Sequence, residues 1–204
     1  MGRALAAPLL AALAGCAGAM SGAPEPVTDP VLLAPGGATL EAANGASWRL
    51  VTDRVMGGVS DGDLRPGRHQ GRECLRLTGA VSTANNGGFV QMALDLGGDA
   101  PLDAGAYRGI ELEVAGNGEA YNVHLRTRGL WLPWQSYRAG FTAEAQWRTL
   151  RLPLTAFEAY RTDRAFDPGA LVRLGIVAIG RDFQADLCVA GVRFYGASEE
   201  APRP

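Results

Sequence analysis

Short stretches in which apolar and polar residues alternate are the strongest constraint that this sequence places on its fold. In the segment 110–114, isoleucine, leucine and valine alternate with two glutamates, so one face is apolar and the other is charged. That pattern is typical of a half-buried antiparallel strand, because successive side chains of a strand point to opposite faces. Similar patterns predict further strands at 74–77, 90–96, 121–126, 136–141, 150–152, 174–179 and 187–194.

Turn signals separate these segments, and helical periodicity is nearly absent. The turn signals lie at 86–88, 97–99, 116–118 and 167–169, and all of them contain glycine. Only two short helical turns are indicated, where Thr155 precedes Glu158 and at 169–171. About nine or ten short strands separated in this way predict an all-β fold, an antiparallel jelly-roll β-sandwich or a partly closed barrel.

Composition limits the classes of function. The 204 residues, 47% of them hydrophobic and 20% charged, suffice for one domain with its own core. All 19 basic residues are arginine, which excludes mechanisms centred on a lysine, such as P-loop or Schiff-base chemistry. The arginines form no cluster in the sequence and the net charge is -2, so we expect no nucleic-acid partner.

The N-terminal residues predict export. Arg3 is followed by an apolar run too short to span a bilayer and then by Leu13-Ala14-Gly15-Cys16. This tetrapeptide resembles the bacterial lipobox, which implies a signal peptide over 1–15 and a lipid anchor on Cys16. We therefore expect a membrane-anchored lipoprotein on the periplasmic side of the cell envelope. The alternatives are an ordinary signal peptide, or a cytoplasmic protein whose start codon is misassigned.

The rest of the chain divides into three parts. Residues 16–38 are rich in proline and glycine and are expected to be a flexible linker. The sandwich is expected over 39–196, followed by a disordered tail over 197–204. Cys74 and Cys188 both lie in predicted strands, and an oxidising compartment permits a bridge between them if their Cα atoms approach within about 7 Å. A disulfide and two buried thiols both stay open, and two buried thiols are the preferred interpretation.

Two glycine-rich motifs are interpreted as mainly structural. The first motif comprises Asp53, Met56, Gly57, Gly58 and Ser60. Its paired glycines permit a bulge or a positive φ, and its polar side chains can bond to turn backbone. The second motif comprises Asn85, Asn86, Gly87 and Gly88. It suits a tight turn, although its amides also suit a sugar hydroxyl. We expect no metal site and no cofactor, because no residues show the spacing of metal ligands.

A polar strand face followed by aromatic residues is the best candidate for a binding surface. His124 and Arg126 lie on the face opposite Val123 and Leu125, and aromatic residues follow directly. Aromatic rings beside amides and arginine suit a groove for carbohydrate or protein. The predicted binding residues are Asn85, Asn86, His124, Arg126, Trp131, Trp134 and Tyr137. The alternative is that the two tryptophans only cover a sheet edge.

One pair of carboxylates resembles an enzyme site. Glu111 and Glu113 lie on one strand face about 7 Å apart, near the separation of an inverting glycosidase pair. Solvated carboxylates side by side on a strand are far commoner, and the other residues of a catalytic pocket are missing. We therefore expect no catalytic residues.

Several motifs, in their order along the chain, resemble the complex I intermediate-associated protein family. They are the segment 53–60, Ser82 with 85–89, 109–110, Tyr121 with 125–126, Tyr137 with Phe141, and Trp147 leading into 152–153. The resemblance covers roughly residues 46–195 and implies a galactose-binding-like jelly roll. Family members act as chaperone-like factors in the assembly of the mitochondrial NADH:ubiquinone oxidoreductase.

Three hypotheses about function follow. The first is a non-catalytic assembly factor that engages protein partners, such as subunits or assembly factors of respiratory complex I. The second is a carbohydrate-binding envelope lipoprotein, and the third is a glycoside-processing enzyme. Mitochondrial family members work in the matrix, which corresponds to the bacterial cytoplasm, whereas the signal at Cys16 predicts export. The compartment therefore separates the first hypothesis from the second.

Overall fold

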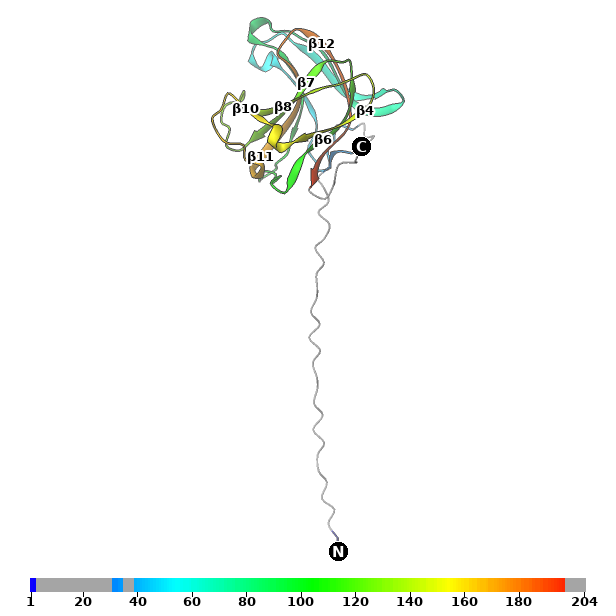
Figure 1. The fold of residues 1–204 in the computed structure, drawn as a ribbon, viewed down its shortest axis with the longest axis vertical. Helices are drawn as coiled ribbons and strands as arrows, with labels where there is room; N and C mark the ends of the chain where they lie inside the picture. Colours follow the sequence, from blue (N-terminus) through cyan, green and yellow to red (C-terminus); the bar gives the residue numbers. More distant parts are fainter. Residues whose placement is uncertain (3–30, 35–38, 197–204) are drawn as a thin grey trace.

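The computed structural model describes residues 1–2, 31–34 and 39–196. In these residues the regular structure consists of β-strands and short 3-10 turns, without an α-helix. The strands form two sheets that pack face to face (Figure 1). The predicted all-β sandwich of the jelly-roll type is therefore confirmed. None of the described residues belongs to a helix long and apolar enough to cross a membrane.

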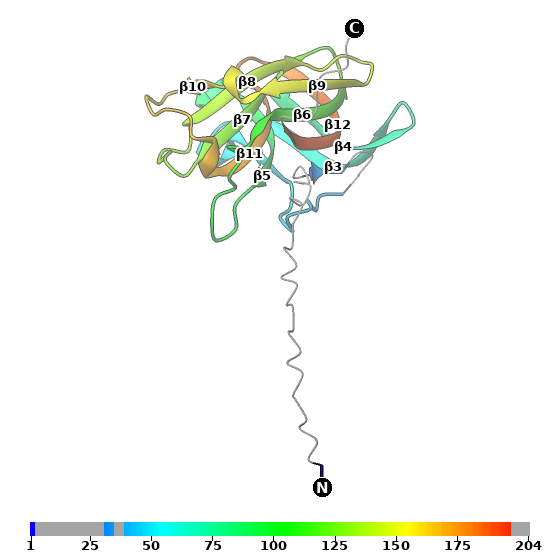
Figure 2. The ribbon, with the colours of Figure 1, turned by 60° about the horizontal axis from the view of Figure 1, so that its bottom comes forward.

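Sheet I has the strand order β3–β4–β12–β6–β9, and β1 also pairs with β12. Its strands are β1 (Val31–Leu33), β3 (Asp61–His69), β4 (Arg72–Val81), β6 (Tyr107–Gly116), β9 (Arg148–Pro153) and β12 (Phe183–Gly196). All pairs are antiparallel. The hairpin of β3 and β4 projects beyond the body of the sandwich (Figure 2).

Sheet II has the strand order β10–β8–β7–β11–β5–β2 and is also antiparallel. Its strands are β2 (Arg49–Thr52), β5 (Phe89–Asp95), β7 (Ala120–Thr127), β8 (Ser136–Thr142), β10 (Glu158–Tyr160) and β11 (Leu171–Ile179). The neighbours β7, β11 and β5 come from distant parts of the chain. Sheet II therefore brings together side chains that lie far apart in the sequence.

Alternation along the strands builds the core between the sheets. In β6 the apolar residues Ile110, Leu112 and Val114 are fully buried, and in β7 Val123 and Leu125 are. Each such side chain contributes about 1.5–3 kcal/mol when it leaves water. The opposite residues of these strands face outward, so the polar face of sheet II is available for a site.

Strand β12 keeps an apolar face toward the core only because it contains a bulge. Leu187 and Val189 belong to the core, and so do Val192 and Phe194, although the two pairs are out of phase in a period of two. The register against β6 shifts between Val189 and Gly191. One extra residue there turns the second half of the strand back toward the core.

The expected linker over 16–38 is too long at its C-terminal end. Val31–Leu33 form β1, and the side chains of Leu32 and Leu33 are buried in the core. The indole nitrogen of the buried Trp48 also donates to the Leu32 carbonyl, at 3.3 Å. Turn-forming prolines and glycines around this short apolar segment concealed it. The other residues of the expected linker, the signal peptide with Cys16 and the tail over 197–204 lie outside the described residues.

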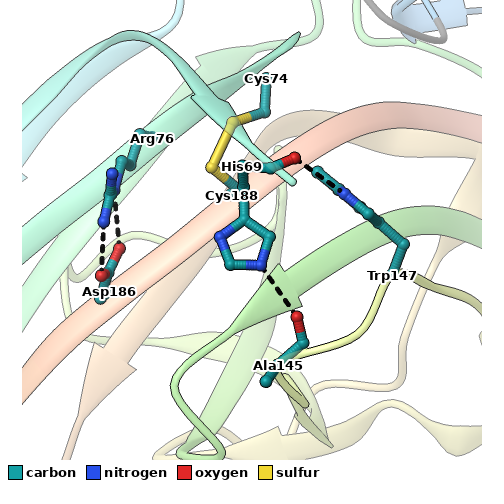
Figure 3. The surroundings of a disulfide bond; sticks show 7 residues. All are labelled: His69, Cys74, Arg76, Ala145, Trp147, Asp186 and Cys188. Atoms are coloured by element: carbon teal, nitrogen blue, oxygen red, sulfur yellow. Dashed lines mark hydrogen bonds and ion pairs between the residues drawn. A yellow bond between two sulfur atoms is a disulfide. The ribbon is translucent and has the colours of Figure 1, made fainter. Parts of the chain in front are cut away.

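Cys74 and Cys188 form a disulfide bond, which corrects the preference for two buried thiols. They lie on the neighbouring strands β4 and β12, with their Cα atoms 5.5 Å apart, a normal spacing for a disulfide (Figure 3). The bond lies in a small apolar cluster with Trp147, on the outer face of sheet I. Three hydrogen bonds tie the β3–β4 hairpin to the β8–β9 loop beside it. The Trp147 indole donates to the His69 carbonyl, and the Ala145 carbonyl is bound by the His69 ring and by the Gln70 amide.

Candidate functional site

A groove of about 580 Å³ crosses the outer face of sheet II. That volume is within the usual range for small-ligand sites, about 300–1,000 Å³. Strands β5, β7 and β11 form the floor. One wall lies on the β2 side of this floor, and the other lies on the side of β8 and β10. The floor residues are Gln91, His124, Gly175 and Val177; the walls contain Val55, Met56 and 86–89 near β2 and β5, and 133–136, Arg138, Tyr160 and Arg161 near β8 and β10.

A glycine shapes the floor of the groove. Gly175 lies opposite His124 in the β7–β11 register and next to β5. A Cβ atom at Gly175 would stand 2.8 Å from the side-chain carbonyl carbon of Gln91. The Gln91 amide therefore lies over Gly175, and the floor presents an amide beside an imidazole.

His124 carries the most unusual polar atom of the site. Its Nε2 atom is buried and has no hydrogen-bond partner among the residues that the structure describes. Burial, together with the positive charge of Arg138, lowers the pKa of His124 to about 3. The imidazole is therefore neutral near pH 7. Buried polar atoms are nearly always hydrogen-bonded, so a ligand atom that reached this nitrogen would supply a bond that the described residues do not.

The neutral imidazole predicts an acid-dependent loss of stability. In the unfolded chain His124 takes up a proton near its ordinary pKa of 6.5, whereas in the folded protein it stays neutral until about pH 3. Between these values the unfolded state binds more protons, so the free energy of unfolding falls as the pH falls. We expect His124→Gln to lose less stability than the wild type between pH 7 and pH 5, measured by urea unfolding. Equal slopes for His124→Gln and wild type would contradict the prediction.

Arg126 holds the loop between β7 and β8. Its Nη1 atom donates to the carbonyls of Leu132, Pro133 and Gln135 at 2.7–2.8 Å, and Nη2 donates to that of Leu130 at 3.3 Å. Arg126 lines the groove as the sequence analysis expected, but its donors bind the protein's own backbone. Its role in this geometry is to position the loop that carries Trp134.

The predicted aromatic residues are divided between three places. Trp134 lines the groove and is 44% exposed, whereas Trp131 is 82% exposed and lies outside the groove lining. Tyr137 points the opposite way, into the core, and its hydroxyl donates to the carbonyls of Arg164 and Ala165. Tyr137 is adjacent in β8 to the outward residue Arg138, so strand alternation places it on the inner face.

Arg138 and Tyr160 are two of the wall residues that the sequence analysis did not predict. The guanidinium carbon of Arg138 lies 3.4 Å above the ring centroid of Tyr160. Arg138 could have been found, because it is on the polar face of a predicted strand. Tyr160 could not, because β10 has only three residues and pairs with β8 through the tertiary fold.

The two glycine-rich motifs meet around one buried carboxylate. Asp53 is fully buried and accepts hydrogen bonds from the backbone of Ser60 at 2.9 Å and of Phe89 at 3.2 Å, from the backbone of Gly88 and from the Ser60 hydroxyl. Any Cβ at Gly58 or Gly87 would overlap the Asp53 side chain. The motifs are therefore a structural clamp, and the clamp forms one wall of the groove.

The remaining motif residues lie beside this clamp. Asn85 and Asn86 both have a positive φ, near 55° and 58°, and Gly57 has φ 88°. Asn86 and Met56 line the groove, while Asn85 is exposed outside the groove lining. The asparagines make the turn that the sequence suggested, and one of them also borders the site.

Glu111 and Glu113 lie on the outer face of sheet I and are paired with arginines. Glu111 is bound by Arg151 at 2.7 Å and by Arg193 at 2.8 Å, and Glu113 by Arg72. Burial alone would raise the pKa of Glu111, but these hydrogen bonds and charges hold it below its ordinary value. A catalytic acid requires the opposite shift. No metal-binding group of three or more His, Cys, Asp or Glu occurs in the part of the chain that the structure describes.

The comparison with protein families decides the classification. The model of complex I intermediate-associated protein 30 (CIA30) matches residues 39–188. The chain belongs to the CIA30 family. This confirms the resemblance inferred from the sequence motifs, and the match includes both halves of the Asp53 clamp. Among curated proteins, no sequence matches this CIA30-family chain.

The solved structures most similar to this CIA30 domain include carbohydrate-binding modules of Clostridium thermocellum. A family 11 module of the cellulosomal cellulase Lic26A-Cel5E has a TM-score of 0.64 at 10% identity and covers 86% of this chain and 99% of its own. A family 30 module of the cellulase Cel9D-Cel44B has 0.61 at 13%, covering 85% and 100%. A family 11 module in complex with a β-1,3-1,4-mixed-linked tetrasaccharide has 0.60 at 13%, covering 75% and 91%. At such identities the likeness shows the fold, a galactose-binding-like jelly roll.

Proposed function

We propose that this protein is a non-catalytic binding module whose groove on sheet II takes a saccharide chain. The observation that carries the proposal is the unpartnered Nε2 atom of His124 in the floor of the groove. A sugar hydroxyl both donates and accepts, so it can satisfy either tautomer of the imidazole. The Gln91 amide beside it supplies a second polar contact.

The walls of the groove also suit a sugar. Trp134 lies on the β8 side and Phe89 on the β5 side. Aromatic rings present an apolar face of the kind that packs against the C–H face of a pyranose, while their surroundings remain polar. The structural likeness to carbohydrate-binding modules, one of them in complex with a tetrasaccharide, supports the same ligand class.

Binding measurements on three variants test this proposal. A glycan array followed by calorimetry should find an oligosaccharide whose affinity falls about tenfold or more in His124→Ala and in Trp134→Ala, because each loses a contact in a desolvated groove. Trp131→Ala is the matched control, because this tryptophan is exposed outside the groove, and it should bind as the wild type does. An array without a bound glycan, or equal losses in all three variants, would contradict the proposal.

A protein partner is the second candidate, and exposed apolar side chains favour it. Val55 and Met56 are 73% and 51% exposed, and Trp131 and Leu132 are 82% and 43% exposed. Exposed apolar side chains of this kind suit a protein interface. In that case the partner is a subunit or assembly factor of respiratory complex I, as the family name suggests. Recovery of such a subunit from solubilised membranes by the wild type, and its loss with Trp131→Ala, would support this candidate over the first.

We also propose that the protein is exported and anchored by a lipid on Cys16. The disulfide between Cys74 and Cys188 supports an oxidising compartment, because disulfides are rare in a reducing cytoplasm. Mass spectrometry of the mature N-terminus, combined with cell fractionation, tests the anchor. An unmodified N-terminus at Met1 in the soluble cytoplasmic fraction would contradict it.

A further inference from the structure

The lining of the groove is positively charged, whereas the chain as a whole has a small negative net charge. Four arginines line it, namely Arg126, Arg138, Arg161 and Arg173, and none of its lining residues is an aspartate or glutamate. The chain as a whole has a net charge of -2 and 21 acidic residues. Acidic residues are therefore absent from the lining itself, although Asp95 pairs with the lining residue Arg173 and Asp53 lies behind the wall glycines.

Two of the four arginines have their side-chain donors engaged by other groups of the protein. Arg173 is paired with Asp95 at 2.7 Å, although Asp95 also binds Arg49 at 2.8 Å. The donors of Arg126 are taken by loop carbonyls, which leave its positive charge uncompensated. Arg49, Arg173 and Asp95 together therefore carry one net positive charge, and Arg126 adds a second.

Arg138 and Arg161 have no carboxylate partner among the described residues. Arg138 donates from Nε to the Ser136 hydroxyl at 2.9 Å and stacks on Tyr160. Glu158 is opposite Arg138 in the β8–β10 register, but the two side chains form no ion pair. Arg161 lies against the same tyrosine ring, 5.3 Å from its centroid. Both guanidinium groups are thus held at the groove by one aromatic ring.

Each arginine at the groove makes the charged form of its neighbour less favourable, because like charges repel. Burial lowers the pKa of Arg138, and the neighbouring Arg161 lowers it further, while Tyr160 acts in the opposite direction. Burial and then Arg173 lower the pKa of Arg126. An anion placed in the groove would relieve this repulsion, and it would do so in a partly desolvated site where charges interact strongly.

We propose that the groove selects an acidic saccharide, one whose sugar units carry carboxylates, and that Arg138 and Arg161 are the residues that recognise it. The inference rests on the proposed function, and it adds the class of saccharide. Guanidinium groups match carboxylates through paired hydrogen bonds, and stacking on Tyr160 holds them in place before the ligand arrives. The neutral imidazole of His124 and the Gln91 amide then face the hydroxyls of the same chain.

A matched pair of ligands separates charge from sugar. The probes are a galacturonic acid oligosaccharide and its fully methyl-esterified form, which has the same backbone without the charges. Calorimetry on the full mature protein should show the acid form binding about tenfold or more tighter. That preference should decrease as the salt concentration rises, because surface charges are screened.

Variants of the arginines test the assignment to residues. Arg138→Gln and Arg161→Gln should each weaken binding of the acid form by about tenfold and change binding of the ester little. Arg161 is exposed, so its variant remains informative if Arg138→Gln fails to fold. Arg65→Gln, on the exposed edge strand β3 of the other sheet, is the matched control and should bind as the wild type does.

Each other outcome overturns a defined part of the proposal. Equal binding of acid and ester, or unchanged preference in both arginine variants, overturns the acidic selectivity and leaves the saccharide function standing. Binding of neither form, together with silence for neutral glucans, overturns both. Poly-glutamate that binds as tightly as the acid oligosaccharide would support the charge of the groove and overturn a saccharide as its ligand.

Discussion

Asp53→Ala is expected to cost about 4 kcal/mol of unfolding free energy, since it removes a buried charged acceptor and leaves several donors without partners. The donors are the backbone of Ser60, Gly88 and Phe89 and the hydroxyl of Ser60. Domains of this size are stable by only about 5–15 kcal/mol, so the variant should be marginal at best. Urea unfolding followed by circular dichroism measures the loss.

Asp53→Asn keeps this prediction testable if the alanine variant does not fold. Burial alone would raise the pKa of Asp53, but the hydrogen bonds from Gly88, Ser60 and Phe89 hold it below its ordinary value of 3.8. A lowered carboxyl pKa contributes stability that is present above about pH 4 and is lost as the pH falls through the folded value. The stability difference between wild type and Asp53→Asn should therefore be about 2 kcal/mol at pH 7 and should shrink below pH 4.

Asp61 serves as the control, because this nearby aspartate has none of the buried hydrogen bonds that Asp53 forms. Asp61 forms one ion pair with Arg54, and its side chain is 77% exposed. Asp61→Ala should change stability by less than about 0.5 kcal/mol. If the Asp53 and Asp61 variants lost similar unfolding free energy, the buried hydrogen bonds of Asp53 would contribute no more than one exposed ion pair, and the prediction would be wrong.

Removal of the disulfide is expected to cost about 3–5 kcal/mol, because the bond closes a long loop of the unfolded chain. Cys74 and Cys188 are 114 residues apart in the sequence. The double variant Cys74→Ala/Cys188→Ala should unfold at lower urea concentration and with a larger m-value, since its unfolded state exposes more surface. Both quantities come from equilibrium unfolding of wild type and variant side by side.

A reducing agent provides the matched control for the disulfide. It should lower the stability of the wild type toward that of the double variant and leave the double variant unchanged. A wild type that is equally stable with and without the reductant, and equal to the double variant, would contradict the prediction.

Two separate hydrogen-bond networks hold the two walls of the groove in place before a ligand binds. The Asp53 clamp fixes the wall next to β5, and Arg126 fixes the loop next to β8 through its backbone contacts. A site whose walls are already ordered loses less conformational entropy when a ligand binds. The clamp therefore connects stability to function, since a variant that loosens it disturbs a wall of the groove as well.

Local patterns in the sequence were enough to predict the class of fold and most strands. Alternation in segments such as 110–114 and 121–126 depends only on which side chains are apolar. These strands can therefore be predicted without knowing the order of strands in the sheet. Strands without that pattern were missed. β3 contains Pro66 and several charged residues, which an edge strand tolerates, and β10 is very short.

The family motifs also required only the sequence, whereas the site required the tertiary structure. His124, Gln91 and Gly175 share a floor because β7, β11 and β5 are neighbours, an order that the chain sequence does not reveal. Alternation says that a side chain points outward, but not which outer face is hollowed. The pairing of Asp53 with Gly88, of Cys74 with Cys188 and of Arg138 with Tyr160 depends on the same long-range order. Short-range physics therefore determined the strands, and packing of distant strands decided the groove.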